Sequence, residues 1–269
     1  MNRVLNIAHR GARSLAPENT LSAARKALSL GADLWETDVL VTWDGELVLL
    51  HDDTLARTTN VADRFPERTP WAVTAFTLAE VRSLDVGSWF VEHDPFGQIA
   101  AGAVTPGELL SFVCQSIPTL REALEFTRDA GWTINLELKP IPEPMDRFPV
   151  VERVLATIDD VGMDADQVII SSFHHDWLHE VRQRRPGMVV QALVGDLISA
   201  IRNPEFTTYN AWDLMVDEDQ IRQAVGHNLV VNLFTVNDED DMRRWIAAGV
   251  TGLFTDFPQR LRSVLAESR

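Results

Sequence analysis

Short runs rich in aliphatic and β-branched residues alternate with amphipathic stretches along most of this chain, and this alternation restricts the fold more than any other feature. It is typical of βαβ units, in which consecutive strands are parallel and the helices cover the sheet. The predicted strands are 4–9, 33–39, 133–139, 168–173, 188–193, 212–216, 229–236 and 250–255. The predicted helices are 20–30, 119–130, 149–161, 175–185, 196–202, 218–226 and 238–248.

A repeated strand and helix unit of this kind within 269 residues suits a single closed α/β barrel, the TIM-like (β/α)8 fold. Several predicted helices end at a glycine, which commonly caps a helix C-terminus, as at Gly31, Gly131, Gly162 and Gly249. Hydrophobic residues make up 45% of the chain, enough for a substantial core. We therefore predict one barrel domain over residues 1–269.

One strand breaks the alternation, because the run ELVLLH (46–51) follows DVLVT (38–42) after only three residues. A parallel connection needs about a dozen residues, so these two segments must be antiparallel neighbours. The fold class is therefore an α/β barrel with a β-hairpin after its second strand.

The turn of this hairpin predicts which side chains meet. Asp44-Gly45 is a strong signal for a two-residue turn. With that turn, His51 lies directly opposite Asp38, on the face that also carries Glu36, because side chains alternate along a strand. The sequence therefore places an imidazole beside two carboxylates.

Residues 52–117 interrupt the alternation with a mixed composition that includes several prolines and glycines. The segment also contains Trp71, Phe76, Trp89 and Phe90, too many large apolar residues for a disordered linker. We predict an inserted subdomain over the barrel mouth, where it would act as a lid that limits the size of the substrate.

Composition excludes several partners. A formal net charge of −16 argues against a nucleic-acid-binding surface and against a polybasic membrane anchor. No stretch approaches the roughly 20 apolar residues that cross a bilayer, and the N-terminus lacks the long apolar segment of a signal peptide. The single cysteine, Cys114, cannot form an internal disulfide. We expect a cytoplasmic protein without nucleic-acid partners or stable membrane association, and a homo-oligomer is left open.

Three carboxylates stand near the ends of the second and third predicted strands, at Glu36, Asp38 and Glu137. Active sites of TIM barrels lie at the face where the strands end. The plainer alternative, an edge strand whose acids face water, is weakened because a strand in a closed barrel has no free aqueous face. Carboxylate oxygens suit hard cations, so we predict one divalent cation, Mg²⁺ or Ca²⁺, with Mn²⁺ also open.

Two histidines could supply acid–base chemistry beside that cation. His9 ends the first predicted strand, and on its own it is better explained as a hydrogen-bonded structural histidine. Together with His51 it would provide an acid and a base, because imidazole titrates near neutrality. The remaining histidines have no HExxH spacing and lie at predicted helix starts or loops, so we do not assign them to catalysis: His93, His174, His175, His179 and His227.

Two cations stand close to the same residues. Arg10 and Lys139 could neutralise phosphate oxygens, Arg10 as a planar fork and Lys139 as a point charge. The simpler roles are an ion pair of Arg10 with Glu18 and one of Lys139 with Glu137. Both kinds of role can hold at once.

Together, the segments HRGARSLAPENT (9–20), ETD (36–38), DGELVLLHDDTLARTT (44–59), LELK (136–139) and FTDFP (254–258) resemble the glycerophosphodiester phosphodiesterase family. SSF (171–173) and FTVN (234–237) extend the likeness over nearly the whole chain. The resemblance implies a TIM-like barrel that hydrolyses a small-molecule glycerophosphodiester to an alcohol and glycerol 3-phosphate.

The resemblance also implies roles for individual residues. His9 and His51 would be the catalytic pair, and Glu36, Asp38 and Glu137 would hold one divalent cation. Arg10 and Lys139 would lie at the phosphate, Phe173 and Phe234 beside the substrate, and Glu18 and Asn19 behind these groups. In related phospholipase-like barrels a substrate hydroxyl attacks phosphorus first and gives a cyclic phosphate, a route that the sequence leaves open.

Three departures from the family pattern bear on the choice of substrate. Position 234 is Phe where the family usually has Trp or Tyr, which removes a polar group near the expected glycerol site. Ala56 replaces a more usual Asp, and residues 97–117 are longer and more apolar than we expect for the family. None of these departures changes the expected cation ligands.

Other functions also fit parts of this pattern. A glycoside hydrolase could use Glu36 and Glu137 as acid and nucleophile, but it would leave His9 and His51 without a role. A lysophospholipase D-type phosphodiesterase would use the same site on a larger substrate. A third alternative is a barrel that binds phosphodiesters without turning them over, which two intact histidines argue against.

Overall fold

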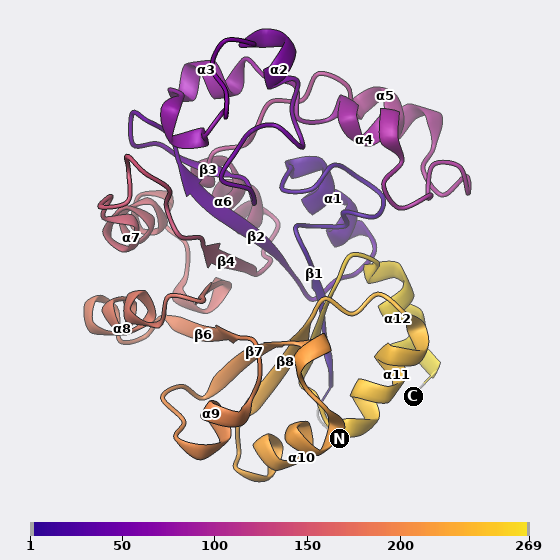
Figure 1. Ribbon diagram of the computed structural model, residues 1–269. Helices are drawn as coiled ribbons and strands as arrows, with labels where there is room; N and C mark the ends of the chain where they lie inside the picture. Colours follow the sequence, from indigo (N-terminus) through magenta and orange to yellow (C-terminus); the bar gives the residue numbers. More distant parts are fainter. Residues whose placement is uncertain (1–2, 268–269) are drawn as a thin grey trace.

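The computed structural model describes residues 3–267, whose strands lie inside a ring of helices (Figure 1). These strands form one sheet in the order β1-β9-β8-β7-β6-β5-β4-β2-β3. Because β1 also pairs with β2, eight parallel strands close into a barrel, with β3 as an antiparallel addition to β2. The barrel strands are β1 (Leu5–Ala8), β2 (Leu34–Val41), β4 (Ile134–Leu138), β5 (Val168–Ser172), β6 (Val189–Val194), β7 (Thr208–Trp212), β8 (Val230–Phe234) and β9 (Gly252–Thr255). The predicted TIM-like barrel is confirmed.

The helices that surround the barrel begin and end at residues suited to those positions. Thr20 and Thr119 accept hydrogen bonds from the first turns of α1 and α6. Gly162 and Gly249 end α7 and α11 with φ of +74° and +107°, a conformation that favours glycine. The helices are α1 (Leu21–Ser29), α6 (Leu120–Asp129), α7 (Val150–Val161), α8 (His175–Arg184), α9 (Ile198–Arg202), α10 (Glu218–Gly226), α11 (Glu239–Ala248) and α12 (Pro258–Glu267). No helix within residues 3–267 is long and apolar enough to span a membrane.

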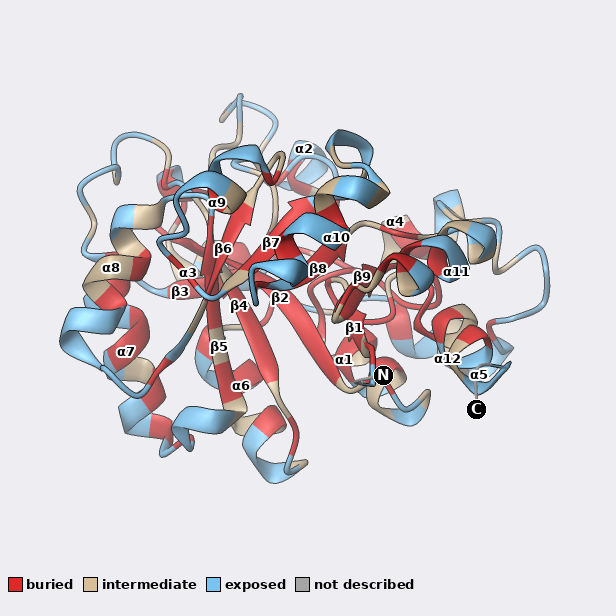
Figure 2. Cartoon of the chain, turned by 90° about the horizontal axis from the view of Figure 1, so that it is seen from below, coloured by how far each residue is buried: buried red, intermediate tan, exposed pale blue. Residues whose placement is uncertain are grey.

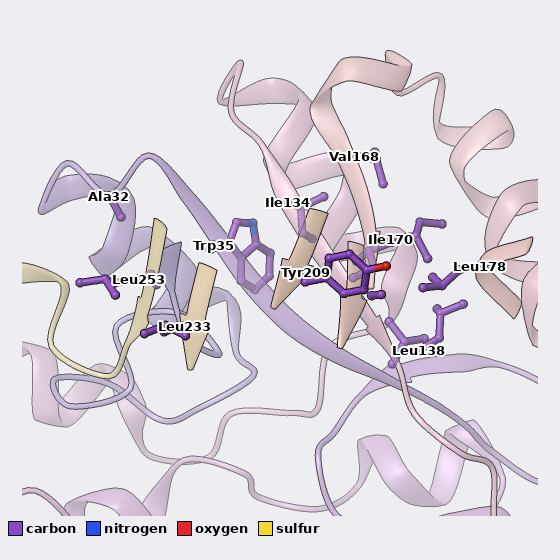
Figure 3. Close-up of a cluster of buried hydrophobic side chains, with 14 of the residues drawn as sticks. Ala32, Trp35, Ile134, Leu138, Val168, Ile170, Leu178, Tyr209, Leu233 and Leu253 are labelled. Atoms are coloured by element: carbon purple, nitrogen blue, oxygen red, sulfur yellow. The ribbon is translucent and has the colours of Figure 1, made fainter. Parts of the chain in front are cut away.

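The main core lies between the barrel strands and the inner faces of these helices, while the outer helix faces are exposed (Figure 2). Trp35 is fully buried there and stacks on Trp132 with ring centroids 6.4 Å apart. Its indole N–H donates to Thr127 on α6, at 3.0 Å. Figure 3 shows Trp35 near Ile134 of β4 in this cluster. Burial of these apolar side chains holds the strands in place and so fixes the barrel mouth.

Two segments differ from the sequence prediction. The apolar run 212–216 predicts a strand, but β7 is Thr208–Trp212 and residues Asp213–Met215 form the 3₁₀ helix η3. The inner face of β7 carries Asn210, which accepts a hydrogen bond from Asn232 of β8 (2.9 Å), so this strand lacks an apolar signature. Helix α12 is absent from the prediction although it begins at a proline, a residue favoured in the first turn.

The hairpin after β2 is confirmed, with β3 (Leu47–Leu49) antiparallel to the far end of β2. The N-terminal end of β2 pairs with β1, and its C-terminal end pairs with β3 along the same edge of the strand. Because β3 runs back toward the barrel, the chain that leaves it returns to the barrel mouth. The predicted register is wrong by one residue, since Asp38 lies opposite Leu50, whose N–H donates to the Asp38 carbonyl (3.2 Å).

The shift arises in the turn, which has three residues rather than two. Thr42 pairs with Glu46 through a backbone hydrogen bond of 3.0 Å, and Gly45 has a φ of +81°. The Thr42 hydroxyl also donates to Asp44 (2.6 Å) and accepts from the Glu46 N–H (3.1 Å), which stabilises the longer turn. His51 follows the end of the paired strand at a bend, so strand alternation no longer decides where its side chain lies.

The inserted segment packs against one side of the barrel as two small apolar clusters. The first, around Phe76 and Val81, contacts Leu40 and Val48 of the hairpin. The second, around Phe90 and Phe112, lies near α1. The elements are α2 (Val61–Arg64), η1 (Val73–Ala75), α3 (Leu78–Arg82), α4 (Ser88–His93) and α5 (Pro106–Phe112). A folded insertion agrees with its composition, and its action as a lid stays a prediction.

Candidate active site

Inward-facing side chains form a ring at the C-terminal ends of the barrel strands. Glu36 and Asp38 share the inner face of β2, because side chains alternate along a strand. Asp38 is the register partner of Glu137 in β4, which brings the third carboxylate to the same place. On the other side of β2, His9 follows β1 and Asp256 follows β9, and the His9 N–H donates to the carbonyl of Thr255 (3.1 Å). The polar residues therefore come from four neighbouring strands.

Glu36, Asp38 and Glu137 form a compact carboxylate triad. One oxygen from each side chain lies within 4.8 Å of those of the other two. Glu36 and Asp38 are almost completely buried, and the Glu137 side chain is 14% exposed. Within residues 3–267, this is the one group of three or more acidic, histidine or cysteine side chains close enough to hold a metal ion. The predicted ligands are thus brought together.

The charges of the triad are not fully balanced by the chain itself. Burial raises the pKa of Glu36 well above its ordinary value, and the charges of Asp38 and Glu137 raise it further. Burial and Asp38 likewise raise the pKa of Glu137. Burial opposes ionisation of Asp38 too, but Arg10, His51 and Lys139 outweigh it and lower its pKa. A further positive charge would therefore stabilise the ionised triad.

Two oxygens of the triad have no hydrogen-bond partner, Glu36 Oε1 and Asp38 Oδ1. Buried polar atoms are normally paired, and an unpaired one calls for an explanation such as an ion. Carboxylate oxygens are the ligands that Mg²⁺, Ca²⁺ and Mn²⁺ prefer. Both the donor chemistry and the unpaired oxygens therefore fit one divalent cation.

Arg10 and Lys139 lie directly beside the triad. The Arg10 backbone N–H donates to Glu36 (2.9 Å), and its guanidinium lies 3.2 Å from Asp38 and 3.0 Å from Glu18. Lys139 Nζ lies 2.9 Å from Glu137 and 3.7 Å from Asp38. The simpler expectation for both cations, an ion pair with a nearby acid, is confirmed.

Asn19 holds Asp38 in position. Its amide donates to Asp38 Oδ2 (2.9 Å), and its carbonyl oxygen accepts from the hydroxyl of Thr37 (2.7 Å). The predicted support by Asn19 is thus visible as direct contacts to β2. These contacts leave Asp38 Oδ1 without a hydrogen bond.

Each site histidine is paired with an aspartate through Nδ1. His9 Nδ1 lies 2.7 Å from Asp256, which also accepts from the amide of Asn237 (2.8 Å). His51 Nδ1 lies 2.6 Å from Asp52. An ionised carboxylate only accepts hydrogen bonds, so Nδ1 carries the proton in each pair. The lone pair or second proton of each ring is then at Nε2, the nitrogen suited to proton transfer.

The two histidines differ in their surroundings. Burial lowers the pKa of His9, Arg10 lowers it further, and Asp256 only partly offsets these effects. The neutral ring is therefore favoured at His9. The His51 side chain is 32% exposed, so solvent reaches it more easily than His9, whose side chain is 14% exposed.

Glu18 connects the two histidine pairs through arginines. Its carboxylate contacts Arg10 (3.0 Å), Arg13 (2.9 Å) and Arg57 (2.7 Å). Burial opposes ionisation, but hydrogen bonds from Arg57 and the charges of Arg13 and Arg10 hold the pKa of Glu18 well below its ordinary value. Glu18 was expected to support the site, and it proves to be the centre of an ionic network.

The outer members of this network were not predicted from the sequence. Arg57 bonds to Asp52 (2.6 Å) behind His51, and Arg13 approaches Asp256 (3.5 Å) behind His9. Asp52 is the sequence neighbour of His51, a signal that could have identified it. Asp256 meets His9 only because closure of the barrel places β9 beside β1, so it needs the three-dimensional fold.

Phe173 and Phe234 lie on the opposite side of the mouth, at the ends of β5 and β8. Their rings meet edge to face with centroids 6.0 Å apart, and Phe173 is 50% exposed. The structure thus brings the two predicted substrate-contacting aromatics together. They are separate from the charged residues, which come from β1, β2, β4 and β9.

Three of the histidines not assigned to catalysis have local partners. His175 bonds to the carbonyl of Leu193 (3.0 Å), and His179 lies 3.2 Å from Glu205 and packs against Phe206. His174 stacks on Trp177. These contacts are structural and lie on or near α8.

Comparison with known proteins agrees with this geometry. The model of the glycerophosphoryl diester phosphodiesterase family matches residues 9–260, which include all the site residues above. The chain belongs to this family.

Relatives of this phosphodiesterase family match the chain along nearly its whole length. The glycerophosphodiester phosphodiesterase of Caldanaerobacter subterraneus subsp. tengcongensis is 33% identical over 96% of each chain. That of Bacillus subtilis is 31% identical over 98% of this chain and 87% of its own length. The structure of an Oleispira antarctica phosphodiesterase in complex with the product sn-glycerol-3-phosphate superposes with a TM-score of 0.78 at 27% identity, covering 97% of this chain and 96% of the other.

Proposed function

We propose that this member of the family hydrolyses glycerophosphodiesters to glycerol 3-phosphate and an alcohol, with one divalent cation bound by Glu36, Asp38 and Glu137. The observation that carries the proposal is the buried triad with its two unpaired oxygens. The family match and the product complex of the Oleispira antarctica phosphodiesterase support it from outside the chain.

The cation, when bound, would polarise the phosphate and balance its negative charge. We assign Arg10 and Lys139 to the same phosphate, because both lie beside the triad and stay protonated at neutral pH. Their carboxylate partners keep both side chains in place before the substrate arrives. In a chain with a net charge of −16, this local positive charge is what allows an anionic substrate to approach.

We assign proton transfer to His9 and His51. The lowered pKa of His9 favours a neutral ring, which suits a base that takes a proton from the attacking oxygen. His51 would then donate a proton to the oxygen of the leaving alcohol as its bond to phosphorus breaks. The attacking group is water or a hydroxyl of the substrate, and in the second case water opens the cyclic phosphate afterwards. Either route adds one water in total.

The aspartates hold the two imidazoles for this task. Asp256 and Asp52 keep the proton on Nδ1 of His9 and His51, so that Nε2 is the atom that exchanges protons with the substrate. Through Arg13 and Arg57, Glu18 would keep both aspartates ionised and correctly placed. We therefore treat Glu18, Asp52 and Asp256 as positioning residues.

The other candidate functions explain less of the site. A glycoside hydrolase with Glu36 and Glu137 has no use for the two histidine and aspartate pairs. A barrel that only binds phosphodiesters would not need them either. Family membership also favours the phosphodiesterase.

A turnover assay with and without metal tests the proposal. Purified protein is treated with chelator and then supplied with Mg²⁺, Ca²⁺ or Mn²⁺, using sn-glycero-3-phosphoethanolamine as substrate and release of glycerol 3-phosphate as the readout. We expect the chelated protein to be inactive and at least one cation to restore turnover. Full activity in chelator would contradict the role of the triad.

Cytoplasmic location and self-association stay predictions. Cell fractionation tests the first, and light scattering of the purified protein tests the second. Neither result alters the assignment of the site, because all of its residues belong to one chain.

A further inference from the structure

Large apolar side chains gather on the half of the barrel mouth that the charged residues leave free. Of the residues at or just after the strand ends there, Phe173 is 50% exposed, Trp212 43%, Leu214 77% and Met215 48%. Together with Phe234 we call these residues the apolar wall. Exposed apolar groups that cluster beside a site usually mark a binding surface.

The register of the sheet shows that the apolar wall is continuous. Trp212 is the partner of Phe234 in the pairing of β7 with β8, so both side chains point to the same face. Phe234 in turn meets Phe173 edge to face. Met215, on η3, packs against Gly195 after β6. The apolar wall therefore extends across the ends of β5, β6, β7 and β8, which are consecutive in the sheet.

We propose that the apolar wall binds an alkyl or acyl chain of the substrate, so that the preferred substrate is an acylated glycerophosphodiester, that is, a lysophospholipid. This inference rests on the proposed function, because it takes the phosphate to lie at the triad. A small polar alcohol such as ethanolamine would leave the apolar wall in water, whereas a chain carried on the glycerol would cover it.

Charge favours a single lipid molecule over a membrane surface as the occupant. Docking to cellular membranes draws on attraction between basic residues and anionic lipids. This chain has a net charge of −16, and none of the five residues of the apolar wall is basic. The apolar wall is also continuous with the site, as expected for a surface that contacts part of the substrate.

The test compares substrates that differ only in the acyl chain, all kept below the concentration at which they form micelles. They are sn-glycero-3-phosphoethanolamine and its butanoyl, hexanoyl and octanoyl esters. Each buried methylene contributes up to about 0.8 kcal/mol, a factor of about four. We expect kcat/KM to rise at least tenfold from the unacylated to the octanoyl substrate.

Two variants with the same chemical change locate the effect. Leu214→Ser should lower the preference for the octanoyl substrate several-fold. Leu110→Ser is the matched control, because Leu110 is 78% exposed and lies on α5, on the far side of the barrel from β7, the strand that η3 follows (Figure 1). It should leave the preference as in the wild type.

The outcomes separate this inference from the proposed function. Turnover of every substrate with no dependence on chain length, or an equal preference in wild type and Leu214→Ser, would overturn the lipid-binding role and leave the phosphodiesterase intact. Sedimentation with neutral vesicles that is lost in Leu214→Ser, together with a flat chain-length series, would indicate a membrane instead. If no substrate turned over, the proposed function would fail. Calorimetric binding of the octanoyl ester to the wild type and to Leu214→Ser would then test the apolar wall, with weaker binding to the variant supporting its role and equal binding contradicting it.

Discussion

The two halves of the barrel mouth are built in different ways. On β9, β1, β2 and β4 each functional side chain has hydrogen-bond or ionic partners that hold it, as Asn19 and Arg10 hold Asp38. On β5 to β8 the exposed side chains are apolar and make few directed contacts, as with Trp212 and Leu214. The first half suits chemistry, which needs fixed geometry, and the second suits recognition of a flexible apolar group.

The largest expected effect is in the triad. Asp38→Ala removes the carboxylate that touches both local cations, and we expect kcat/KM to fall by about a thousandfold or more, in line with the several kcal/mol that a metal ion contributes. Cation affinity measured by calorimetry should fall with it, while circular dichroism stays that of the folded protein. If this variant bound the cation with wild-type affinity, Asp38 would not be a ligand of the cation. The same experiment applies to Glu36→Ala and Glu137→Ala.

A histidine variant separates proton transfer from cation binding. His51→Gln should lower kcat by roughly a hundredfold to ten-thousandfold, the usual range for loss of a general acid or base. Cation affinity should stay close to that of the wild type, because His51 is not among the proposed ligands of the cation. A parallel loss of affinity would show that His51 binds the ion.

Glu18→Gln probes the network that joins the two histidine pairs. We expect about a tenfold to hundredfold loss in kcat with little change in KM, as is common for groups that orient catalytic residues. Glu18→Asp, which keeps the charge, should recover part of the activity, whereas a defect of packing alone would not depend on the charge.

The same variant has a definite pH dependence. The folded pKa of Glu18 lies well below the ordinary value of 4.5, so its ion pairs add stability above that pH and lose it as the pH falls further. Near neutral pH, Glu18→Gln should cost about 2 kcal/mol, less than a fully buried pair because Arg57 is partly exposed. Urea unfolding at several pH values measures this, and a difference that grows toward low pH would contradict the ion pairs.

The smallest effect is expected beside the apolar wall. Burial and the nearby charge of Asp241 raise the pKa of Asp213, on η3, to about 6. The folded state therefore holds its proton more tightly, and this residue costs stability as the pH rises from about 4 to above 6. Because Asp213 is only half-buried and solvent screens its charge, Asp213→Asn should stabilise the protein by only about 1 kcal/mol near pH 8 and have no effect near pH 4. If the variant and the wild type had the same unfolding midpoint at pH 8 as well as at pH 4, this assignment would be wrong.

The sequence predicts the charged half better than the apolar half, for physical reasons. Charged residues in barrel strands such as Glu36 and Asp38 are conspicuous, because they cannot face water along a closed strand. Asp256 is missed because its partner His9 is brought near only when the barrel closes. The run around Leu214 predicts a strand because apolar residues usually indicate burial, whereas here they are exposed.

The hairpin shows how a local detail changes a register. Asp44-Gly45 favours a two-residue turn, but the Thr42 hydroxyl bonds to Asp44 and Glu46 and stabilises a three-residue one. His51 lies beyond the paired residues, and its charge still contributes, after that of Arg10, to the lowered pKa of Asp38. This influence agrees with the expectation that His51 lies near the carboxylates, although the pairing used to reach it is wrong by one residue and a direct contact stays a prediction.

A one-pot competition between sn-glycero-3-phosphoethanolamine and its octanoyl ester tests the division between the two halves most directly. The ratio of the two kcat/KM values is measured for wild type, His51→Gln and Leu214→Ser. We expect His51→Gln to slow both substrates and keep the wild-type ratio, and Leu214→Ser to shift the ratio several-fold toward the unacylated substrate. A ratio changed by His51→Gln, or left unchanged by Leu214→Ser, would contradict it.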